Sequence, residues 1–597
     1  MYWKINQWGT VAGGYPPPGI SLLGRGEKML FYDFEVFKYD WLVVVMDMTA
    51  RKTHVIINSP EELEALYKAN IKEIWCGFNS RHYDQYILKA ILCEFDPKKV
   101  NDYIIVRGNP GWKYSSLFNQ FPLLNYDVML GTDRGLKSFE GFMGNDIKES
   151  SVPFDIDRKL TEEEIAETVK YCKHDVSNTV QVFLKRTEEF NTMMYFIKHF
   201  NLPIDFISKT KAQLAAEILG GNRKGQDFHD EFDFPILDCL DLKKYRFIAD
   251  WYRQPENHDY TRKQDKVMVA GVEHTFSWGG GHGARAKYSS SGIFLIIDVT
   301  AYYPSLQKKY HFGYRVMNHP ENFEFIHDSN IEFKRKGDKK ARQPFKIMDN
   351  AISGQMKQKQ SSLYDPMSNN SICINGQLLL LDLVEHIEPY CELIQNNTDG
   401  IIVKIKDYER DFDKLDDIVY EWEQRTGMKM DFDTFIGDIY QKDVNNYLLI
   451  DRETGAVKSK GGYVMKLNDL SYDLPIINRA LVDYMIKGVP VERTVNECDD
   501  LREFQLVSRI SSKYTHILYG DRPIKEKCIR IFASKSNSDP GVKKVHATTK
   551  RAAKLQNSPE HCFIWNDDVK GVSVPDKLDR EWYISFAKKR LSDFGVM

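Results

Sequence analysis

The sequence predicts a multidomain α/β protein, and three observations support this fold class. The chain has 597 residues, which corresponds to about three to five domains at ~100–200 residues each. Hydrophobic residues make up 42% of it and charged residues 28%, which is typical of an ordinary folded protein and argues against a disordered or fibrous chain. Two separate blocks, starting near residues 29 and 291, combine β-branched apolar runs with segments of helical periodicity.

The first block is expected to form an α/β domain over residues 29–190. Residues 29–49 contain two apolar runs separated by a few polar residues, which is typical of consecutive strands. A capped helix is expected over 58–70, a buried strand over 71–79 and a long amphipathic helix over 160–190. Strands followed by alternating helices and strands indicate an α/β arrangement.

The second block is interrupted. It begins with a strand at 291–299 that runs into a turn, and it resumes at 369–407 with a helix, a strand, a turn and another strand. The stretch between them is basic and compatible with helices. Residues 191–284 are expected to be mainly helical and connecting, and the tail from about 446 has mixed character.

Charge is unevenly distributed along the chain. The formal net charge is −3, but residues 509–555 contain twelve basic and three acidic residues, a net charge of +9 that leaves −12 for the rest. Such a segment is a candidate surface for the phosphate backbone of a nucleic acid. A solvated lysine-rich face explains the same residues equally well.

Several classes of protein are disfavoured by composition. No stretch approaches the ~20 continuous apolar residues that span a membrane. Residues 1–28 are rich in Gly and Pro, lack the features of a signal peptide and are expected to form an irregular lead-in. The nine cysteines include no CxxC pair, which argues against a cysteine zinc module and suggests reduced thiols in a cytosol.

Two acids interrupt the first apolar strand. Asp33 and Glu35 lie two residues apart, so in a strand both carboxylates point to the same face. An apolar strand does not bury two acids together without a cation, because like charges repel and desolvation is costly. Mg²⁺, which prefers oxygen ligands, would resolve this. For an isolated pair of acids, a solvent-exposed strand face is the more common explanation.

Further motifs follow in order and carry a resemblance. One motif is N-x3-Y-D, in which Asp84 follows Asn79 and Tyr83. The other is Y-x3-D, in which Tyr171 and Asp175 lie four residues apart and therefore on one helix face. With Asp33 and Glu35, these motifs resemble the DEDDy 3′–5′ exonuclease of family B DNA polymerases, which has an RNase H-like fold. The resemblance implies that the four acids hold two metal ions, that Tyr171 orients the attacking water, and that Lys137 contacts the scissile phosphate.

The second block also places acids beside apolar strands. Asp298 directly follows five apolar residues, and Asp399 lies in a turn between two apolar runs, which is typical of a β-hairpin. An acid that ends a buried strand and an acid at a hairpin tip can converge on one pair of metal ions. Two unrelated turn-forming aspartates are the alternative.

The context of these two acids resembles the palm of family B polymerases. Asp298 opens DVTAYYPS, which is similar to the first palm motif, D-x2-S-L-Y-P-S, and Asp399 lies in NNTDG, which is similar to the third, Y-x-D-T-D-S. Between them, KIMDNAISG, starting at Lys346, is similar to the second, K-x3-N-S-x-Y-G. The sequence departs from the pattern at Asn397, which replaces the first acid of D-T-D, and at Asn445, which replaces the lysine of a later K-x-Y motif.

The resemblance implies a right-hand polymerase after the exonuclease domain. It places the palm at 285–305 and 365–445, short fingers at 306–364 and the thumb or duplex-binding region at 446–597. Residues expected to bind DNA are Lys460, Lys513, Lys525, Lys527, Lys543 and Lys544.

It also implies roles at the polymerase site. Asp298, the backbone carbonyl of Val299 and Asp399 would hold two Mg²⁺, with Mn²⁺ as a substitute. Tyr303 would exclude a ribose 2′-hydroxyl. Residues expected to contact the incoming nucleotide or its phosphates are Lys346, Asn350, Arg335 and Arg342.

The function implied is a DNA-directed DNA polymerase with proofreading, similar to short bacteriophage replicative enzymes. Asp298 and Lys346 are 48 residues apart and Lys346 and Asp399 are 53, which leaves no room for the insertions of protein-primed polymerases. Expected partners are primer–template DNA, dNTPs, and a phage helicase, primase, clamp or single-strand binding protein. No membrane or protein primer is expected, and the expected location is the cytoplasm of a bacterial host.

Two alternatives remain open. In the second palm motif, Ala351 and Ser353 replace the Ser and Tyr of the family pattern. These changes and Asn397 are compatible with a 3′–5′ exonuclease whose polymerase half is degenerate. The chain could also be a non-catalytic DNA-binding or scaffolding protein, in which case replacing Asp33 or Asp399 would change no activity.

Overall fold

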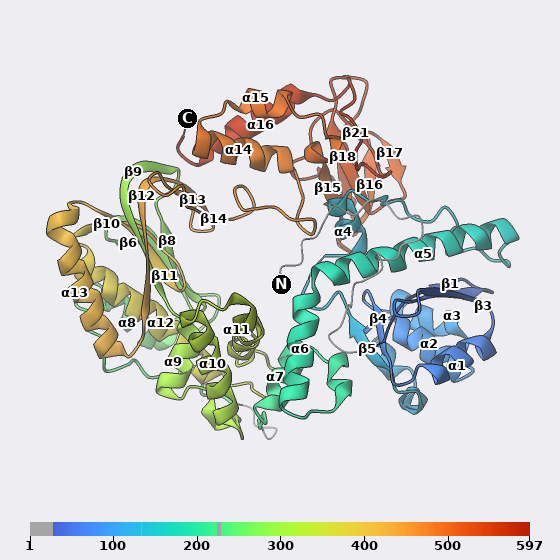
Figure 1. Cartoon of the computed structure of the whole chain (residues 1–597), viewed down its shortest axis with the longest axis horizontal. Coiled ribbons are helices and arrows are strands. Elements are labelled where there is room, and N and C mark those ends of the chain that lie inside the picture. Colours follow the sequence, from blue (N-terminus) through green and yellow to red (C-terminus); the bar gives the residue numbers. More distant parts are fainter. Residues whose placement is uncertain (1–27, 133, 224–227, 597) are drawn as a thin grey trace.

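The computed structural model describes residues 28–132, 134–223 and 228–596. The lead-in expected at 1–28 therefore lies outside the described residues, apart from Lys28. Figure 1 shows three bodies: a five-stranded sheet with its helices, a longer sheet backed by helices, and a C-terminal body of small sheets and helices. The prediction of a multidomain α/β protein is confirmed. Among the described residues, no helix is both long enough and apolar enough to cross a bilayer.

The first sheet has the strand order β3-β2-β1-β4-β5. β1 pairs antiparallel with β2 and parallel with β4, so it lies at the centre. Phe31 and Val44 pack with Cys172 and Val176 of α5 on one face, and the alternate residues of β1 and β2 pack with α1 and α2 on the other. The strands are β1 (Met29–Val36), β2 (Trp41–Asp47), β3 (Lys52–Ile57), β4 (Ile74–Gly77) and β5 (Leu124–Asp127).

Helices surround this sheet and lead away from it. α5 begins with a capping box between Thr161 and Glu164 and packs on β1 and β2. The helices of this part are α1 (Pro60–Ala69), α2 (Asp84–Leu92), α3 (Pro97–Asn101), α4 (Leu136–Met143), α5 (Glu162–Lys185), α6 (Thr187–His199) and α7 (Lys211–Ile218). The next helix, α8 (Arg246–Arg253), packs in the core of the second body.

The second sheet has nine strands in the order β14-β13-β12-β9-β11-β10-β8-β7-β6. α12 and α13 cover one of its faces, where Leu295, Ile297 and Val299 of β9 are buried. The strands are β6 (Lys263–Val269), β7 (Val272–Ser277), β8 (Gly280–Ala284), β9 (Tyr288–Val299), β10 (Cys391–Asn396), β11 (Gly400–Ile405), β12 (Met430–Asp443), β13 (Asn446–Asp451) and β14 (Val457–Lys460).

This sheet extends beyond the expected palm at both ends. β6, β7 and β8 lie within 191–284, which was expected to be mainly helical and connecting, and β13 and β14 lie within the expected thumb. The strands were missed because β8 is a glycine-rich segment without β-branched residues, and because β6 carries several exposed polar side chains. Sheet pairing, and not intrinsic propensity, holds these residues in extended form.

Helices between and behind the strands complete this body. α10 and α11 pack side by side, and α11 also packs on α6 of the first body, with the rings of Phe345 and Phe196 centred 5.6 Å apart. The helices are α9 (Tyr302–Tyr310), α10 (Pro320–Arg335), α11 (Lys339–Ser353), α12 (Pro366–Ile387) and α13 (Tyr408–Thr426).

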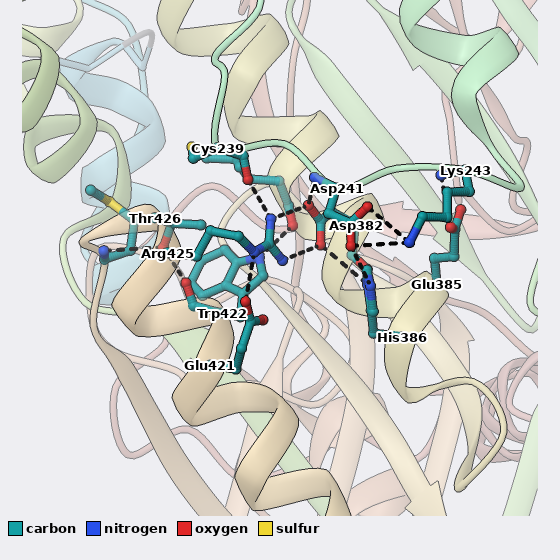
Figure 2. A network of polar contacts seen from close by, with 12 residues as sticks. Cys239, Asp241, Lys243, Asp382, Glu385, His386, Glu421, Trp422, Arg425 and Thr426 are labelled. Carbon is teal, nitrogen blue, oxygen red and sulfur yellow. Dashed lines mark hydrogen bonds and ion pairs between the residues drawn. The ribbon is translucent and has the colours of Figure 1, made fainter.

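A buried ion pair joins the helices behind the second sheet (Figure 2). Asp382 of α12 is fully buried and accepts two hydrogen bonds from Arg425 of α13, at 2.8 and 2.9 Å. The backbone N–H of Asp241 donates to the same carboxylate at 2.7 Å, and His386 lies 3.3 Å from it. Because every charge has a partner, the network fixes α12 and α13 against the segment that precedes α8.

The C-terminal body combines two small sheets, β15-β18-β21 and β17-β16-β19-β20, with three helices. Its strands are β15 (Leu506–Arg509), β16 (Tyr514–Tyr519), β17 (Arg522–Ile524), β18 (Cys528–Ala533), β19 (Val542–His546), β20 (Ala552–Lys554) and β21 (Cys562–Ile564). Its helices are α14 (Pro475–Lys487), α15 (Val491–Asn496) and α16 (Arg580–Asp593).

Arg530 ties the C-terminal body to the first body. It belongs to the basic segment 509–555, yet it is fully buried and donates to the backbone carbonyls of Gly141 and Asn145 at the end of α4, at 3.1 and 2.7 Å. Burial lowers its pKa to about 10. This side chain therefore holds two domains together and is closed to a phosphate.

Candidate functional site

The four acids of the first motif set gather at one end of β1. Asp33 and Glu35 point to the α5 side, where the Cys172 sulfur lies 3.7 Å from Asp33 Oδ2. Asp84 is the first residue of α2, and its carboxylate accepts a hydrogen bond from the backbone N–H of Phe34 at 3.1 Å. Asp175 on α5 completes the group, because its charge acts on both Asp33 and Glu35.

These carboxylates repel one another in a dry environment. Burial, followed by the charges of neighbouring acids, raises the pKa of Asp33 and of Glu35 well above the ordinary values. Asp84 is 2% exposed, and burial raises its pKa to about 7 even though the Phe34 N–H stabilises its charge. A cluster of this kind calls for added positive charge.

The donor set fits a hard divalent cation. Oxygen atoms of Asp33 and Glu35 and the sulfur of Cys172 lie within 4.8 Å of one another. Mg²⁺ prefers carboxylate oxygens to a thiol, so Asp33, Glu35, Asp84 and Asp175 are the candidate ligands, and Cys172 packs beside them.

Lys137 supplies a cation next to this cluster. Its Nζ lies 2.8 Å from Asp175 Oδ1 and 3.1 Å from Glu140 Oε2. Burial alone would lower the pKa of Lys137, but Asp175 and Glu140 outweigh it and raise that pKa. Glu140 is fully buried and was not singled out from the sequence, although its i,i+3 spacing from Lys137 on α4 is a recognisable signal.

Tyr171 and Asp127 border the same cluster. Tyr171 donates its hydroxyl proton to Glu149 Oε2 at 3.3 Å, and the Lys137 amine lies 4.6 Å from the centre of its ring. Asp127, at the end of β5, accepts hydrogen bonds from the backbone N–H groups of Asn79 and Arg81 at 2.8 and 3.0 Å. Asp127 thereby holds the loop that delivers Asp84 to the cluster.

The two acids of the second motif set meet across neighbouring strands. Asp298 of β9 pairs with Gly400 of β11, and the N–H of Val299 donates to the backbone carbonyl of Asp399 at 2.8 Å. A Cβ at Gly400 would lie 2.1 Å from Asp298 Oδ1, so only glycine leaves room for this carboxylate. Asp298 shares the strand face of Phe294 and Ile296, opposite α12.

Two further aspartates line this second cluster. Asp431 of β12 lies directly opposite Asp298, and Asp433 follows two residues later on the same face. Lys458 of β14 bridges the group, with Nζ 3.3 Å from Asp298 and 3.1 Å from Asp433. Burial raises the pKa of Asp298, Lys458 partly offsets this and Asp399 adds to it.

Sequence reasoning missed Asp431, Asp433 and Lys458. The alternation DFD in MDFDTF was an available signal, since it repeats the pattern that identified Asp33 and Glu35. Asp431 is also ion-paired with Lys334 of α10, which connects β12 to the helices that follow Tyr303.

Tyr303 lies beside the second cluster. A Cβ at Gly376 of α12 would lie 3.0 Å from its ring, and a Cβ at Gly280 of β8 would lie 3.8 Å from its hydroxyl. Burial raises the pKa of Tyr303, and Asp399 is among the charges that act on it. The ring therefore packs closely on Gly376, and its hydroxyl lies near Gly280.

The residues expected in the fingers have different surroundings. Lys346 and Asn350 are exposed and lie one turn apart on α11, and Arg335 is exposed at the end of α10. Arg342 instead donates to Asn330 Oδ1 at 2.9 Å. In the described chain, no hydrogen bond or ion pair joins Lys346 or Asn350 to Asp298 or Asp399.

A buried polar chain links α10 and α11 to α9, the helix that carries Tyr303. Asn330 donates to Asp349 at 2.9 Å, and His327 bridges Asp349 at 3.1 Å and Ser305 Oγ at 3.4 Å. Ser305 follows Tyr303 on α9, so the orientation of α10 and α11 is coupled to the helix that carries Tyr303.

The lysines expected to bind DNA lie on β14 and in the C-terminal body. Lys513, Lys527 and Lys543 are exposed, whereas the Lys544 amine lies 4.2 Å from the centre of the Tyr514 ring. Lys525 is exposed but donates to the backbone carbonyl of Ser150 in the first body. Lys460 is the last residue of β14 and is half-buried.

Comparisons with known proteins give only a distant likeness, and it is to solved structures. No family model matches the chain, and no curated protein matches it. Among solved structures, the chain is similar to the family B DNA polymerase of the hyperthermophilic archaeon Pyrobaculum calidifontis. The identity is 14%, the match covers 98% of this chain and 79% of that one, and the TM-score is 0.38. At this TM-score the two folds overlap too loosely for residues to be matched between them.

Proposed function

We propose that this protein is a DNA-directed DNA polymerase with a 3′–5′ proofreading exonuclease. One observation carries the proposal: two carboxylate clusters lie on two different sheets, and each has a lysine in direct contact with one of its acids. Two-metal sites of this composition transfer or hydrolyse phosphodiesters, because closely spaced carboxylates concentrate divalent cations. The resemblance of both motif sets to family B polymerases supports the same assignment.

At the polymerase site, Asp298, the carbonyl of Val299 and Asp399 would hold two Mg²⁺ or Mn²⁺. When bound, the metals neutralise phosphate charge and lower the pKa of the primer 3′-hydroxyl. Lys458 keeps the Asp298 carboxylate oriented. The Tyr303 ring, which packs on Gly376, would form a wall against a 2′-hydroxyl and so favour dNTPs.

The fingers and the C-terminal body would handle phosphates. Lys346, Asn350 and Arg335 present a polar face to the triphosphate, and Arg342 supports that face through Asn330. Lys460, Lys513, Lys525, Lys527, Lys543 and Lys544 would hold the duplex by its backbone, so binding would weaken with salt.

At the exonuclease site, Asp33, Glu35, Asp84 and Asp175 would hold two further metal ions. Asp175 and Glu140 hold the Lys137 amine beside this cluster, where it would contact the scissile phosphate. Tyr171 would orient the attacking water after leaving Glu149. A frayed, mispaired primer end can enter such a site as a single strand.

The biological setting belongs to the same proposal. A short polymerase without room for protein-priming insertions fits bacteriophage replication in the cytoplasm of a bacterial host. Primer–template DNA and dNTPs would be its substrates. A helicase, primase, clamp or single-strand binding protein would be its partners.

A nuclease with a degenerate polymerase half is the second candidate. Asn397 motivates it, because it replaces an acid of the third palm motif. In the structure the Asn397 N–H donates to the carbonyl of Gly400 at 2.8 Å and closes the hairpin turn. This backbone bond does not depend on the side chain at 397, so the turn that carries Asp399 is compatible with an intact site.

The test is primer extension with Mg²⁺ and dNTPs, and primer degradation when dNTPs are withheld. Asp399→Ala should abolish extension alone, and Asp33→Ala should abolish degradation alone. The exposed acids Asp413 and Asp155 provide matched Asp→Ala controls that should keep both activities. A wild-type chain that degrades primers but never extends them would favour the second candidate.

A further inference from the structure

A cavity of about 650 Å³ lies beside the loop that carries Asp84, on the edge of the first sheet. The start of α2, the segment 104–112, β5 and residues 208–209 line it. Its volume falls within the ~300–1,000 Å³ of small-molecule and cofactor sites. None of its lining residues is one that either motif set specifies, since Arg81 and His82 occupy the variable positions between Asn79 and Tyr83.

The walls of this cavity are cationic. Arg81, His82 and Lys209 line it, and no carboxylate does. Lys209 is exposed and forms no ion pair within the described ranges. In a protein whose charges are nearly balanced, three basic side chains without an acid favour an anionic ligand.

Two polar groups at the cavity wall lack partners among the described residues. Arg81 donates from Nη2 to Gln213 at 2.8 Å, but its buried Nη1 has no acceptor. Asn125 is 2% exposed, and its amide oxygen accepts hydrogen bonds from Tyr32 and Ser80. The amide nitrogen Nδ2 of Asn125 can only donate, and it has no acceptor among the described residues. Unsatisfied buried donors are costly, so acceptor oxygens of a ligand are the natural complement.

The cavity also offers an aromatic surface. Trp112 lines it and is 63% exposed, which is unusual for so large an apolar ring. Tyr86 lies on the neighbouring wall, where a Cβ at Gly111 would come within 2.2 Å of its ring. Gly111 thus lets the two aromatic residues occupy one small site.

We propose that this cavity binds one nucleotide unit, with the base against Trp112 and the phosphate near Arg81 and Lys209. Aromatic stacking combined with a basic wall is how proteins hold unpaired nucleic acid without reading its sequence. The unit would come from a single-stranded DNA segment, and a free mononucleotide is the other source of the same chemistry. None of the acids of either cluster is needed for this binding.

The test is photocrosslinking of the full chain carrying Asp33→Ala, which prevents loss of the oligonucleotide. A thymidine oligonucleotide with one 5-iodouracil is irradiated with the protein, and labelled peptides are mapped by mass spectrometry. The peptide with Trp112 should be labelled, and Lys209→Glu should reduce labelling at least fivefold. The exposed Lys99 of the same domain gives a matched control, Lys99→Glu, which should leave labelling unchanged.

A second arm separates the sources of the nucleotide. If 5-iodo-dUMP labels the Trp112 peptide as strongly as the oligonucleotide does, the ligand is a free nucleotide, and if only the oligonucleotide labels it, the ligand is a strand. Equal labelling in Lys209→Glu and Lys99→Glu, or no labelling of this peptide by either probe, would overturn the proposal. Because the readout needs no catalysis, a failure of the proposed polymerase activity would not be mistaken for a failure here.

Discussion

Replacing Asp84 by Asn should stabilise the metal-free protein at pH 8. The folded-state pKa of Asp84 is about 7, against an ordinary value of 3.8. Since the pKa is raised on folding, the ionised carboxylate costs the folded state free energy above that pKa, and the cost disappears at low pH. Asn removes the charge, keeps the shape and can still accept the hydrogen bond from Phe34.

The size of the effect follows from the shift. A difference of about three pKa units corresponds to roughly 4 kcal/mol at pH 8, at ~1.4 kcal/mol per unit. At pH 5 the folded-state carboxylate is mostly protonated, so the gain should fall to less than half. With ~2–4 °C per kcal/mol in a domain of 150–250 residues, the transition of the first domain should rise by about 8 °C or more at pH 8.

The assay is thermal unfolding in EDTA at pH 8 and pH 5, repeated with saturating Mg²⁺ at pH 8. Mg²⁺ should stabilise the wild type more than Asp84→Asn, because binding to the folded state adds stability in proportion to affinity. Asp155→Asn, an exposed acid of the same domain, should change neither transition.

Two results would refute this reasoning. A lower transition temperature for Asp84→Asn in EDTA at pH 8 would mean that the carboxylate stabilises the empty site. A gain of equal size at pH 5 and pH 8 would mean that ionisation of the buried Asp84 carboxylate is not its cause.

Three further predictions concern the other bodies. Gly400→Ala should reduce primer extension at least tenfold and spare degradation, because the added Cβ would displace Asp298. Gly279 has open space around it, so Gly279→Ala should match the wild type in the same extension assay. Tyr303→Val should raise incorporation of rNTPs relative to dNTPs about tenfold or more in single-nucleotide extension, and an unchanged ratio would remove Tyr303 from sugar selection. Arg530→Met should lower the melting temperature by several degrees, because buried carbonyls would lose donors worth ~1–3 kcal/mol each, and Arg530→Lys should lower it less. A melting temperature of Arg530→Met equal to that of the wild type would contradict the role of Arg530 in joining the two domains.

The acids were accessible to sequence reasoning because strand alternation and motif order are local properties. Asp33 and Glu35 share a strand face as the two-residue period requires. Asp399 lies in the turn of the β10–β11 hairpin, and β11 pairs with β9, the strand that carries Asp298. The pairing of Asp431 with Asp298 depends on β12 lying beside β9, which no local pattern announces.

Long-range packing decided the other differences. The cation in contact with Asp298 is Lys458, 160 residues away, and it reaches the site only because β14 joins the second sheet. Arg530 looks like its basic neighbours in sequence, but it lies within β18 and is fully buried, where its guanidinium donates to the carbonyls of Asn145 and Asp567. Burial of a charge is a property of the assembled domains, so composition assigned this arginine to a solvent-facing surface.

The most direct test of the two-site account is one reaction on a primer with a mismatched 3′ nucleotide, with all dNTPs present. The wild type should remove the mismatch and then extend the corrected primer to full length. Asp33→Ala should leave the mismatch in place or extend it slowly, and Asp399→Ala should shorten the primer without any extension. Full-length product with the mismatch removed in either variant would contradict the assignment of the two activities to separate carboxylate clusters.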